Sequence, residues 1–166
     1  MLQTHRLLVG DEQTLREIRL RSLRGEPSAY GSSYELENAF VEADWRRRVA
    51  GIDSASFVCE LDDSGAIGLV SGVLDQSQAS VAWLVAMWVD PEYRRKGVAG
   101  LLISEVIAWS AMQNCTTIRL FVTDGNVRAD RTYEKHGFRR TGTTELRDRD
   151  NTIENEMELT LIRKVN

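Results

Sequence analysis

One short stretch of the chain combines basic side chains, small residues and the start of a predicted helix. Asp90–Gly100 reads DPEYRRKGVAG and lies between an apolar run, Val81–Val89, and a helical pattern that begins at Val98. The first N–H groups of a helix have no partners inside it, and the helix dipole adds partial positive charge at that end. Three consecutive basic residues add full charge, and small residues let another group approach the backbone closely. The stretch therefore predicts a binding site for phosphate groups.

The glycine spacing of this stretch differs from that of the common nucleotide-binding loops. Gly97 and Gly100 are separated by two residues, so the stretch is neither G-x-x-x-x-G-K-[ST] nor G-x-G-x-x-G. A glycine at a helix start after basic residues is weak evidence when it stands alone. A second segment strengthens the interpretation: Asn126–Phe138, NVRADRTYEKHGF, carries an amide, a phenol and further basic side chains on a predicted helix that Gly137 ends.

The elements that must position these two segments are predicted from periodicity and turn residues. In chain order we expect a strand, a helix, two short helices, three strands of an antiparallel meander, a helix, a strand, a helix and two strands, over 2–9, 11–25, 34–40, 42–49, 55–61, 66–74, 81–89, 98–112, 117–123, 126–136, 138–143 and 156–162. Since the run 81–89 is apolar on both faces, we expect it at the centre of its sheet. Trp83 and Trp88 stand at an odd spacing on it and are predicted to face opposite sides. Together the elements indicate one mixed α/β domain over 1–166.

Composition excludes several classes of function. The 166 residues are 42% hydrophobic and 28% charged, as in ordinary globular proteins, and the longest apolar run is far shorter than the roughly 20 residues of a membrane-spanning helix. The charged start of the chain argues against a signal peptide, and two cysteines make no disulfide framework, so we expect a cytoplasmic protein with no membrane partner. His5 and His136 have no ligand partners at metal-binding spacing, so we expect no metal.

The negative charge of the chain is concentrated in one segment. Residues 145–158 hold six acidic side chains and two arginines, which accounts for the whole formal net charge of −4. The basic stretch described above lies in the neutral remainder. A mildly acidic chain of this kind is not expected to bind nucleic acid. The division favours an anionic ligand at the basic stretch and a cationic one near the acidic segment.

The two chemical segments together resemble those of the GNAT superfamily of acyl-CoA-dependent N-acetyltransferases. The family's phosphate loop, [R/Q]-x-x-G-x-[G/A], is matched by Arg94, Gly97 and Ala99. Its later segment, N-x-x-A-x-x-x-Y-x-x-x-G-F, is matched in full by Asn126, Ala129, Tyr133, Gly137 and Phe138. Residues 19–45 are similar to one large bacterial branch of the family, so the resemblance covers nearly the whole chain. It implies a mixed α/β fold with a mostly antiparallel central sheet, two splayed parallel strands at 81–89 and 117–123, and flanking helices.

The resemblance implies a reaction and a set of site residues. The reaction is transfer of the acetyl group of acetyl-CoA to a primary amine by direct attack, with Tyr133 as general acid. The cofactor-binding residues it implies are Met87, Trp88 and Val89 along the pantetheine arm, Arg95, Lys96, Gly97, Val98, Ala99 and Gly100 at the pyrophosphate, Asn126 at the arm, Arg94, Arg128, Arg131 and Lys135 at the outer phosphates, and Tyr133. Dimers are common in the family, so a homodimer is one expected assembly.

The general base and the acceptor are left open. Some family members carry a glutamate on the strand before the phosphate loop, but residues 83–89 contain no carboxylate. Glu35 and Glu37 are candidates near the acceptor cleft, and Glu156 and Glu158 are candidates near the last strand; ordered water or a weakly basic amine would also serve. The acceptor is expected to be a small amine, cationic if the charge division is functional. The alternatives are a protein N-terminal or lysine acetyltransferase, and a non-catalytic acyl-CoA-binding regulatory module.

Overall fold

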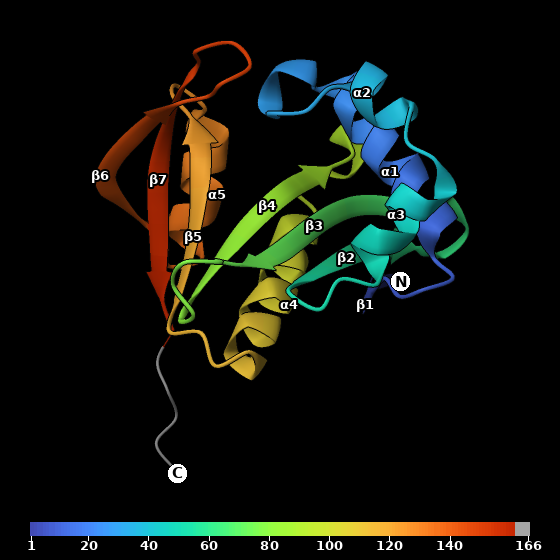
Figure 1. The fold of residues 1–166 in the computed structure, drawn as a ribbon, viewed down its shortest axis with the longest axis horizontal. Helices are drawn as coiled ribbons and strands as arrows, with labels where there is room; N and C mark the ends of the chain where they lie inside the picture. The colour runs from blue at the N-terminus through green and yellow to red at the C-terminus, as the bar shows by residue number, and fades with distance from the viewer. Residues whose placement is uncertain (162–166) are drawn as a thin grey trace.

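The structure, a computed structural model, describes residues 1–161, and its seven strands form one sheet in the order β1-β2-β3-β4-β5-β7-β6 (Figure 1). Every neighbouring pair is antiparallel except β4 and β5, which are parallel. The strands are β1 (Leu2–Arg6), β2 (Ser54–Leu61), β3 (Ala66–Leu74), β4 (Val81–Val89), β5 (Thr117–Thr123), β6 (Arg139–Leu146) and β7 (Ile153–Thr160). The expected mostly antiparallel sheet with one parallel pair is thus confirmed, and β4 lies at its centre.

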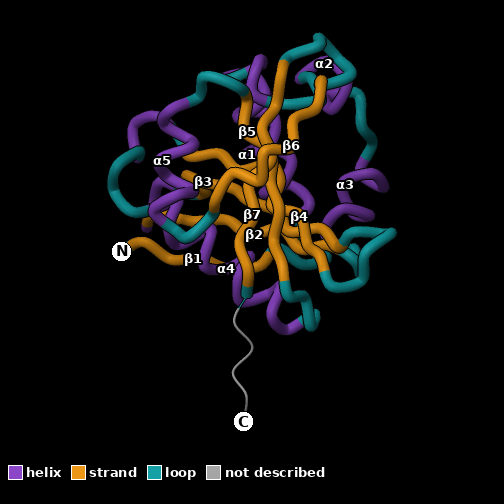
Figure 2. Tube along the Cα trace, turned by 90° about the vertical axis from the view of Figure 1, so that its left-hand side faces the viewer, coloured by secondary structure: helices purple, strands orange, loops and turns teal. Residues whose placement is uncertain are grey.

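Five α-helices flank the sheet, and they are visible on both sides of the strands in Figure 2. They are α1 (Glu12–Gly25), α2 (Tyr34–Asn38), α3 (Glu42–Val49), α4 (Val98–Met112) and α5 (Val127–Lys135). The largest differences from the expected strand boundaries are that β1 ends earlier, at Arg6, that β6 continues to Leu146, and that β7 begins at Ile153; the starts of β2 and β6 each differ by one residue. Ile162, the expected end of the last strand, lies outside the described residues. Among residues 1–161 no helix is long and apolar enough to cross a membrane.

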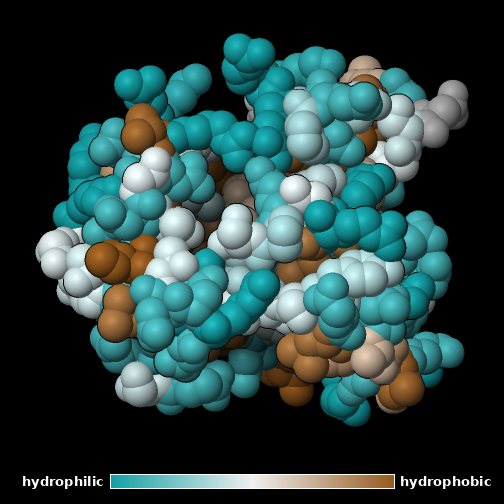
Figure 3. Space-filling model, turned by 90° about the horizontal axis from the view of Figure 1, so that it is seen from above, coloured by the Kyte–Doolittle hydropathy of each residue, from teal (hydrophilic) through white to brown (hydrophobic). Residues whose placement is uncertain are grey.

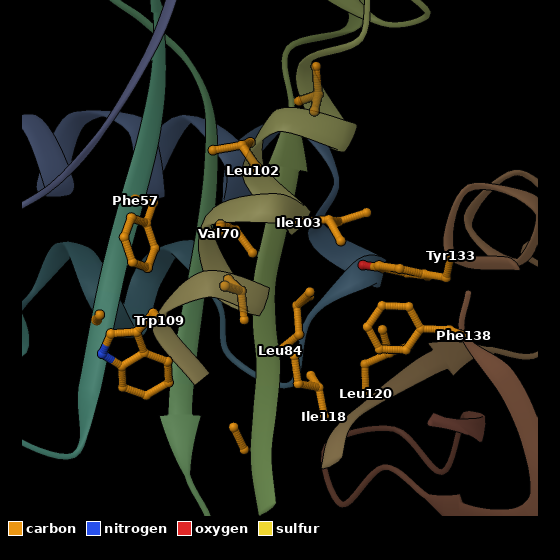
Figure 4. Close-up of a cluster of buried hydrophobic side chains, with 14 of the residues drawn as sticks. Phe57, Val70, Leu84, Leu102, Ile103, Trp109, Ile118, Leu120, Tyr133 and Phe138 are labelled. Carbon is orange, nitrogen blue, oxygen red and sulfur yellow. The ribbon is translucent and has the colours of Figure 1, made fainter. Parts of the chain in front are cut away.

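Two hydrophobic clusters hold the helices to the sheet, one on each face. The larger contains buried residues of α4 and α5 packed on β2 to β5, among them Leu102, Trp109 and Tyr133 (Figure 4). The smaller packs α1 and α3 against the other face, where Trp45 and Leu69 are almost fully buried. Because β3 and β4 are covered on both faces, they are rich in apolar residues at consecutive positions.

The two parallel strands pair only at their beginnings. Register positions join Val81, Ala82 and Trp83 of β4 to residues 117–119 of β5, and the strands diverge beyond them (Figure 1). The backbone groups on this side of the second half of β4 therefore have no partner strand. Such an unpaired edge inside a sheet can accept an extended ligand in place of a strand.

A β-bulge in β4 changes which side chains face which side. In the register with β3, Leu69 lies opposite Trp88 and Ser71 lies opposite Val85, so two β4 residues stand against one residue of β3. Ala86, in the bulge, has a φ of 55°, in the left-handed region that non-glycine residues rarely adopt. An extra residue of this kind reverses the alternation of side chains along the strand.

The bulge overturns the expectation that the two tryptophans of β4 face opposite sides. Trp83 lies opposite Val73, and Trp88 lies opposite Leu69. Leu69 and Val73 are four residues apart on β3 and face the same side, and residues directly opposite each other share a face. Both tryptophans therefore lie on the α1–α3 face of the sheet. The prediction was wrong because it assumed that side chains alternate with a period of two along the whole strand, and the bulge inserts one extra residue between the two tryptophans.

Candidate active site

A cavity of about 390 Å³ opens where β4 and β5 diverge. It is bounded by the second half of β4, the loop and first turn of α4, the end of β5, and α5. Residues expected at the cofactor site that line it are Met87, Trp88, Val89, Arg94, Arg95, Gly97, Val98, Ala99, Gly100, Asn126, Arg128, Tyr133 and Lys135. Lys96 and Arg131 are not among its lining residues. Seen from above, the surface is hollowed in its middle between hydrophilic sides (Figure 3).

The loop before α4 is shaped for an anion. Arg95 and Gly97 have φ values of 63° and 87°, so the chain turns sharply twice before the helix begins at Val98. Gly97 is the N-cap, and an added Cβ there would meet nothing within 4 Å, so the backbone is open at the helix start. Gly100 is needed for a different reason, since a Cβ would lie 2.8 Å from Nε2 of His136. The free N–H groups of the first helical turn therefore face an accessible space beside the cavity.

Arg94 and Arg128, both expected at the outer phosphates, share one carboxylate. Nη2 of Arg94 lies 2.9 Å from Oε1 of Glu26, and Nη2 of Arg128 lies 3.3 Å from the same oxygen. Arg94 also donates from Nε to the carbonyl of Val89 at 2.9 Å. Glu26 follows α1 directly, so this ion pair joins the end of α1 to α5 across one side of the cavity. Sequence analysis missed Glu26 because nothing in the local pattern links it to residues so far along the chain.

Two tyrosines meet the cavity from opposite elements. Tyr133 of α5 is 7% exposed, and Figure 4 shows its ring beside Phe138 with the hydroxyl pointing away from α5. Burial raises the pKa of Tyr133 above its ordinary value, and the nearby Tyr30 raises it further, so the phenol keeps its proton at neutral pH. Tyr30 donates from its hydroxyl to the carbonyl of Met87 at 3.3 Å, and burial raises the pKa of Tyr30 to about 12. Sequence reasoning had not assigned Tyr30 to the site.

The carboxylates considered as bases occupy very different places. Glu35 is exposed on α2 and lines neither this cavity nor the second pocket described below. Glu37 is fully buried and accepts hydrogen bonds from Arg19 at 2.9 and 3.1 Å and from Arg48 at 2.9 Å. Burial alone would raise the pKa of Glu37, but Arg19, followed by Ser32 and Arg48, outweighs it, so the pKa of Glu37 lies below its usual value. Glu37 is thus committed to two arginines outside the cavity.

The three glutamates of β7 also differ in their surroundings, because two are paired with other side chains and one lines the cavity. Glu156 accepts a hydrogen bond from Oγ1 of Thr141 at 2.8 Å, and Glu158 pairs with Arg119 at 2.8 Å. Glu154, two residues before Glu156 and on the same face of β7, lines the cavity. Burial raises the pKa of Glu154 above its usual value despite Arg147, whose Nη1 lies 3.4 Å from Oε1. Alternation with the other two glutamates was the only signal for Glu154 in the sequence.

Asn126 is the N-cap residue of α5. Its Oδ1 accepts a hydrogen bond from the N–H of Ala129 at 3.2 Å, which caps the start of α5. The amide nitrogen of Asn126 is not used by that bond. The residue therefore fixes the helix that carries Tyr133 and still offers a donor at the cavity wall.

A second pocket, of about 340 Å³, lies on the α1–α3 face of the sheet. It shares Tyr30, Val85 and Ala86 with the first cavity, so the two spaces meet at the β4 bulge. Its polar lining residues are Arg19, Arg48, Ser54, Ser56 and Ser71. A group placed in each space would thus be separated only by the bulge and by Tyr30.

The loop between β6 and β7 is fastened to the segment that follows α1. Nη1 of Arg149 donates to the carbonyls of Pro27, Tyr30 and Ser32 at 2.7 to 3.0 Å, and Nη2 of Arg147 donates to that of Ser28 at 2.7 Å. The two segments lie side by side at the top of Figure 1. This contact brings the acidic region 145–158 to the site and occupies its two arginines.

Comparison with known proteins agrees with this geometry. The family model described as Acetyltransferase (GNAT) family matches residues 14–138. Among solved structures, an acetyltransferase of the GNAT family from Streptococcus pneumoniae superposes with a TM-score of 0.79 at 18% identity, over 98% of this chain and 100% of that one. Spermidine N-acetyltransferase from Vibrio cholerae, in complex with CoA and spermine, gives 0.74 at 22% identity, over 96% of this chain and 95% of that one.

A third similar structure, the ribosomal-protein-S18-alanine N-acetyltransferase from Escherichia coli, gives a TM-score of 0.69 at 18% identity, over 100% of this chain and 99% of that one. No curated protein matches the sequence significantly. At these identities the solved structures show a common fold, and the family is shown by the model that matches most of the chain. The chain belongs to the GNAT family of acetyltransferases.

Proposed function

We propose that the protein transfers the acetyl group of acetyl-CoA to the primary amine of a small acceptor by direct attack. The observation that carries this proposal is the meeting of two pockets at the β4 bulge. One pocket offers free helix N–H groups and an unpaired strand edge, as an extended molecule with phosphates requires. The other is lined by polar side chains and reaches the same point from the opposite face.

The lining of the first cavity supports the binding of acetyl-CoA. The N–H groups from Arg95 to Gly100 would hold the pyrophosphate. The edge of β4 from Met87 to Val89, which no strand pairs, would hold the pantetheine arm, although its Met87 and Val89 carbonyls now accept hydrogen bonds from Tyr30 and Arg94. Asn126 and Lys135 lie along the opposite wall. When bound there, acetyl-CoA supplies the thioester whose carbonyl carbon is attacked. Arg94 and Arg128 would approach the outer phosphates by exchanging the Glu26 carboxylate for phosphate oxygens.

The residues at the bulge and around it would perform the proton transfers. Glu154 takes a proton from the ammonium form of the acceptor, and the neutral nitrogen then forms the new N–C bond. A backbone N–H at the bulge stabilises the negative charge on the carbonyl oxygen. As the C–S bond breaks, Tyr133 gives its hydroxyl proton to the sulfur, and the proton that the nitrogen loses after attack restores the phenol.

The raised pKa values of Glu154 and Tyr133 suit these roles. A carboxylate with a raised pKa is a better proton acceptor than an ordinary one. A buried phenol is a weaker acid than usual, but the same burial raises the proton affinity of a thiolate leaving group in its neighbourhood. We therefore choose Glu154 as the base. Unlike the four glutamates considered from the sequence, it lines the cavity.

The docked β6–β7 loop favours a small acceptor over a polypeptide. Arg149 binds three carbonyls of the segment after α1, which narrows access between the two. A protein acceptor would need an open groove for several residues on either side of its amine. The loop would have to release these hydrogen bonds to admit such a chain.

The proposal is tested by calorimetry with acetyl-CoA and by a screen of acetyl-CoA consumption over amines, amino acids and peptides. We expect binding, and turnover with at least one small amine. Tyr133→Phe should lower kcat about a hundredfold with unchanged affinity for acetyl-CoA, since general acid catalysis contributes that much. Tyr34→Phe, outside both pockets, is the matched control. Binding without turnover in any arm would instead establish a regulatory acyl-CoA-binding module, and absence of binding would refute both readings.

A further inference from the structure

The second pocket carries a positive charge that the transfer reaction itself does not use. Of the described residues that line it, two are arginines, Arg19 and Arg48, and none is acidic. Both arginines contact the buried carboxylate of Glu37, whose pKa is held low by them. Two positive charges thus face one negative charge, and the cluster keeps a net positive charge beside the pocket.

Arg19 has a buried N–H group without a partner. Its Nε and Nη2 atoms donate to Glu37, and its guanidinium lies over the ring of Tyr30 at 4.8 Å. Nη1 has no hydrogen-bond partner within the part of the chain that the structure describes, although Arg19 is only 8% exposed. A buried charged donor left unpaired is costly, and such groups in native proteins have an explanation in a ligand or an ordered water.

Arg48 is held so that its remaining donors are available. Nη1 lies 2.9 Å from Oε2 of Glu37, and the guanidinium stacks on the rings of Phe40 and Trp45 at 5.0 and 5.3 Å. Its side chain is nevertheless 39% exposed. Stacking of this kind fixes the plane of the group without using its N–H donors. The guanidinium of Arg48 is therefore held in one orientation, with N–H donors available to a ligand.

The floor of the pocket adds hydroxyl donors. Ser56 and Ser71 lie opposite each other on β2 and β3, with their oxygens 2.7 Å apart. Only one of the two hydrogens lies between the oxygens, so the pair has a hydroxyl hydrogen left for a ligand. The remaining walls include Leu15, Leu69 and Val73, which are apolar. The pocket thus combines charged and neutral donors with an apolar wall.

We infer that the acceptor carries a carboxylate, which Arg19 and Arg48 bind while the amine lies at the β4 bulge. The inference rests on the proposed function and names the acceptor class: an amine with an acid group and an apolar side chain, of the size of an amino acid. Arginine and carboxylate groups form charge-assisted, paired hydrogen bonds, which give both affinity and orientation. The acidic region 145–158 favours a cationic acceptor, but the charges that line this pocket favour an anionic one.

Matched pairs of acceptors test the inference. We would compare L-leucine, L-methionine and L-phenylalanine with their carboxamides, which keep the amine and lose the negative charge, and add spermidine as a cationic amine. The acids should show a kcat/KM at least about tenfold higher than the amides, because a site built for a charged group discriminates against an analogue that leaves its donors unpaired. Acids that react no faster than amides or spermidine would overturn the inference.

Two arginine variants on one helix separate a specific effect from a general one. Arg48→Gln should raise the KM of the acids about tenfold or more and so bring their kcat/KM down to that of the amides in the same variant. Arg47→Gln removes the same charge one position away, where the side chain is 73% exposed and pairs with Asp44, and it should change neither. Equal losses for acids and amides in Arg48→Gln would mean a structural role only and would overturn the inference.

A binding measurement keeps this test independent of turnover. Calorimetry of N-acetyl-L-leucine and N-acetyl-L-leucinamide, titrated into the protein with and without CoA, should show binding of the acid alone and its loss in Arg48→Gln. No binding of the acid in either state would overturn the inference. Failure of acetyl-CoA to bind would refute the proposed function instead, so the two failures are distinguishable.

Discussion

The two pockets that meet at the β4 bulge are built from different parts of the polypeptide. The first cavity, called the cofactor-side cavity from here on, takes its candidate phosphate-binding wall from one continuous stretch, 87–100, and its other walls from β5, α5 and β7. The second pocket, called the acceptor-side pocket from here on, is formed mainly by side chains from α1, α3, β2 and β3, which are far apart in sequence. A phosphate-binding loop can thus be recognised from residue types in order, whereas a charged side-chain cluster depends on how the elements pack.

The two regions also differ in what their charges are doing. At the first cavity, Arg94 and Arg128 share a partly exposed carboxylate, Glu26, which the phosphates of acetyl-CoA would replace in the proposed function. At the second pocket, Glu37 is fully buried between Arg19 and Arg48, so its charge stabilises the packing of these two side chains. An exposed carboxylate between arginines can therefore be displaced by a ligand, whereas a buried one between arginines stabilises the folded structure.

The largest expected effect breaks the acceptor-side cluster. Glu37→Gln should lower the free energy of unfolding by about 3 kcal/mol, because it leaves a buried arginine without its counter-charge. Urea denaturation measures the loss, with exposed Glu35→Gln as control. Since the pKa of Glu37 is lower in the folded protein than its usual 4.5, its stabilisation is complete above that value and disappears as the pH falls through the folded pKa. A difference from wild type that grew in acid would contradict this account.

A second change tests whether Glu154, in the first cavity, acts as the general base. Glu154→Gln should lower kcat about a hundredfold, in the range of general base catalysis. The base acts when deprotonated, so wild-type activity should fall at low pH through a raised pKa, and this acidic limb should be absent in the variant. The pH profile of kcat/KM measures it. Glu156→Gln, on the same face of β7 but hydrogen bonded to Thr141, is the matched control and should keep the limb.

A third change tests whether the cofactor side depends on its backbone. Gly97→Ala should cost about 1 kcal/mol of stability, because φ is 87° there and side chains disfavour the left-handed region. Acetyl-CoA affinity should fall as well, since the helix N–H groups would be displaced, while binding of N-acetyl-L-leucine to the other pocket stays the same. Calorimetry of both ligands separates the outcomes. Equal weakening of the two would argue against two independent regions.

The smallest effect concerns the β6–β7 loop, which is hydrogen bonded to the segment after α1. Arg149→Ala removes three hydrogen bonds to carbonyls after α1 and should raise the KM of the acceptor several-fold with little change in kcat. Hydrogen exchange of residues 27–32 should become faster. Arg149→Lys restores the charge but not the fork and should recover only part of the effect. An unchanged KM together with faster exchange would show that the contact is structural and does not control access.

Sequence reasoning was most successful where a function depends on neighbours along the chain. The strand–loop–helix unit from Val81 to Met112 was predicted with the boundaries that the structure has. The helix that carries Tyr133 was predicted within one residue at each end. Both depend on local signals: an apolar run, a glycine at a helix start or end, and a capping asparagine.

The choice of base and the partners of Glu26 could not be read in this way. Glu154, Glu156 and Glu158 alternate on one strand with similar neighbours, and nothing local distinguishes the one that lines the cavity. Its position depends on the divergence of β4 from β5, which leaves the space that Glu154 reaches. Glu26 meets Arg94 and Arg128 only because α1 ends beside α5.

The sequence by itself determined the strand–loop–helix unit from Val81 to Met112, the buried central strand and the helix that carries Tyr133, because each is set by residues close together in the chain. Only the tertiary structure decided what Ala86 does. Its left-handed φ inserts one residue into the register, reverses the side-chain alternation, places Trp83 and Trp88 on the same face, and brings two pockets together. A bulge depends on the partner strand as well as on its own residues, so the period of two read from one strand cannot reveal it.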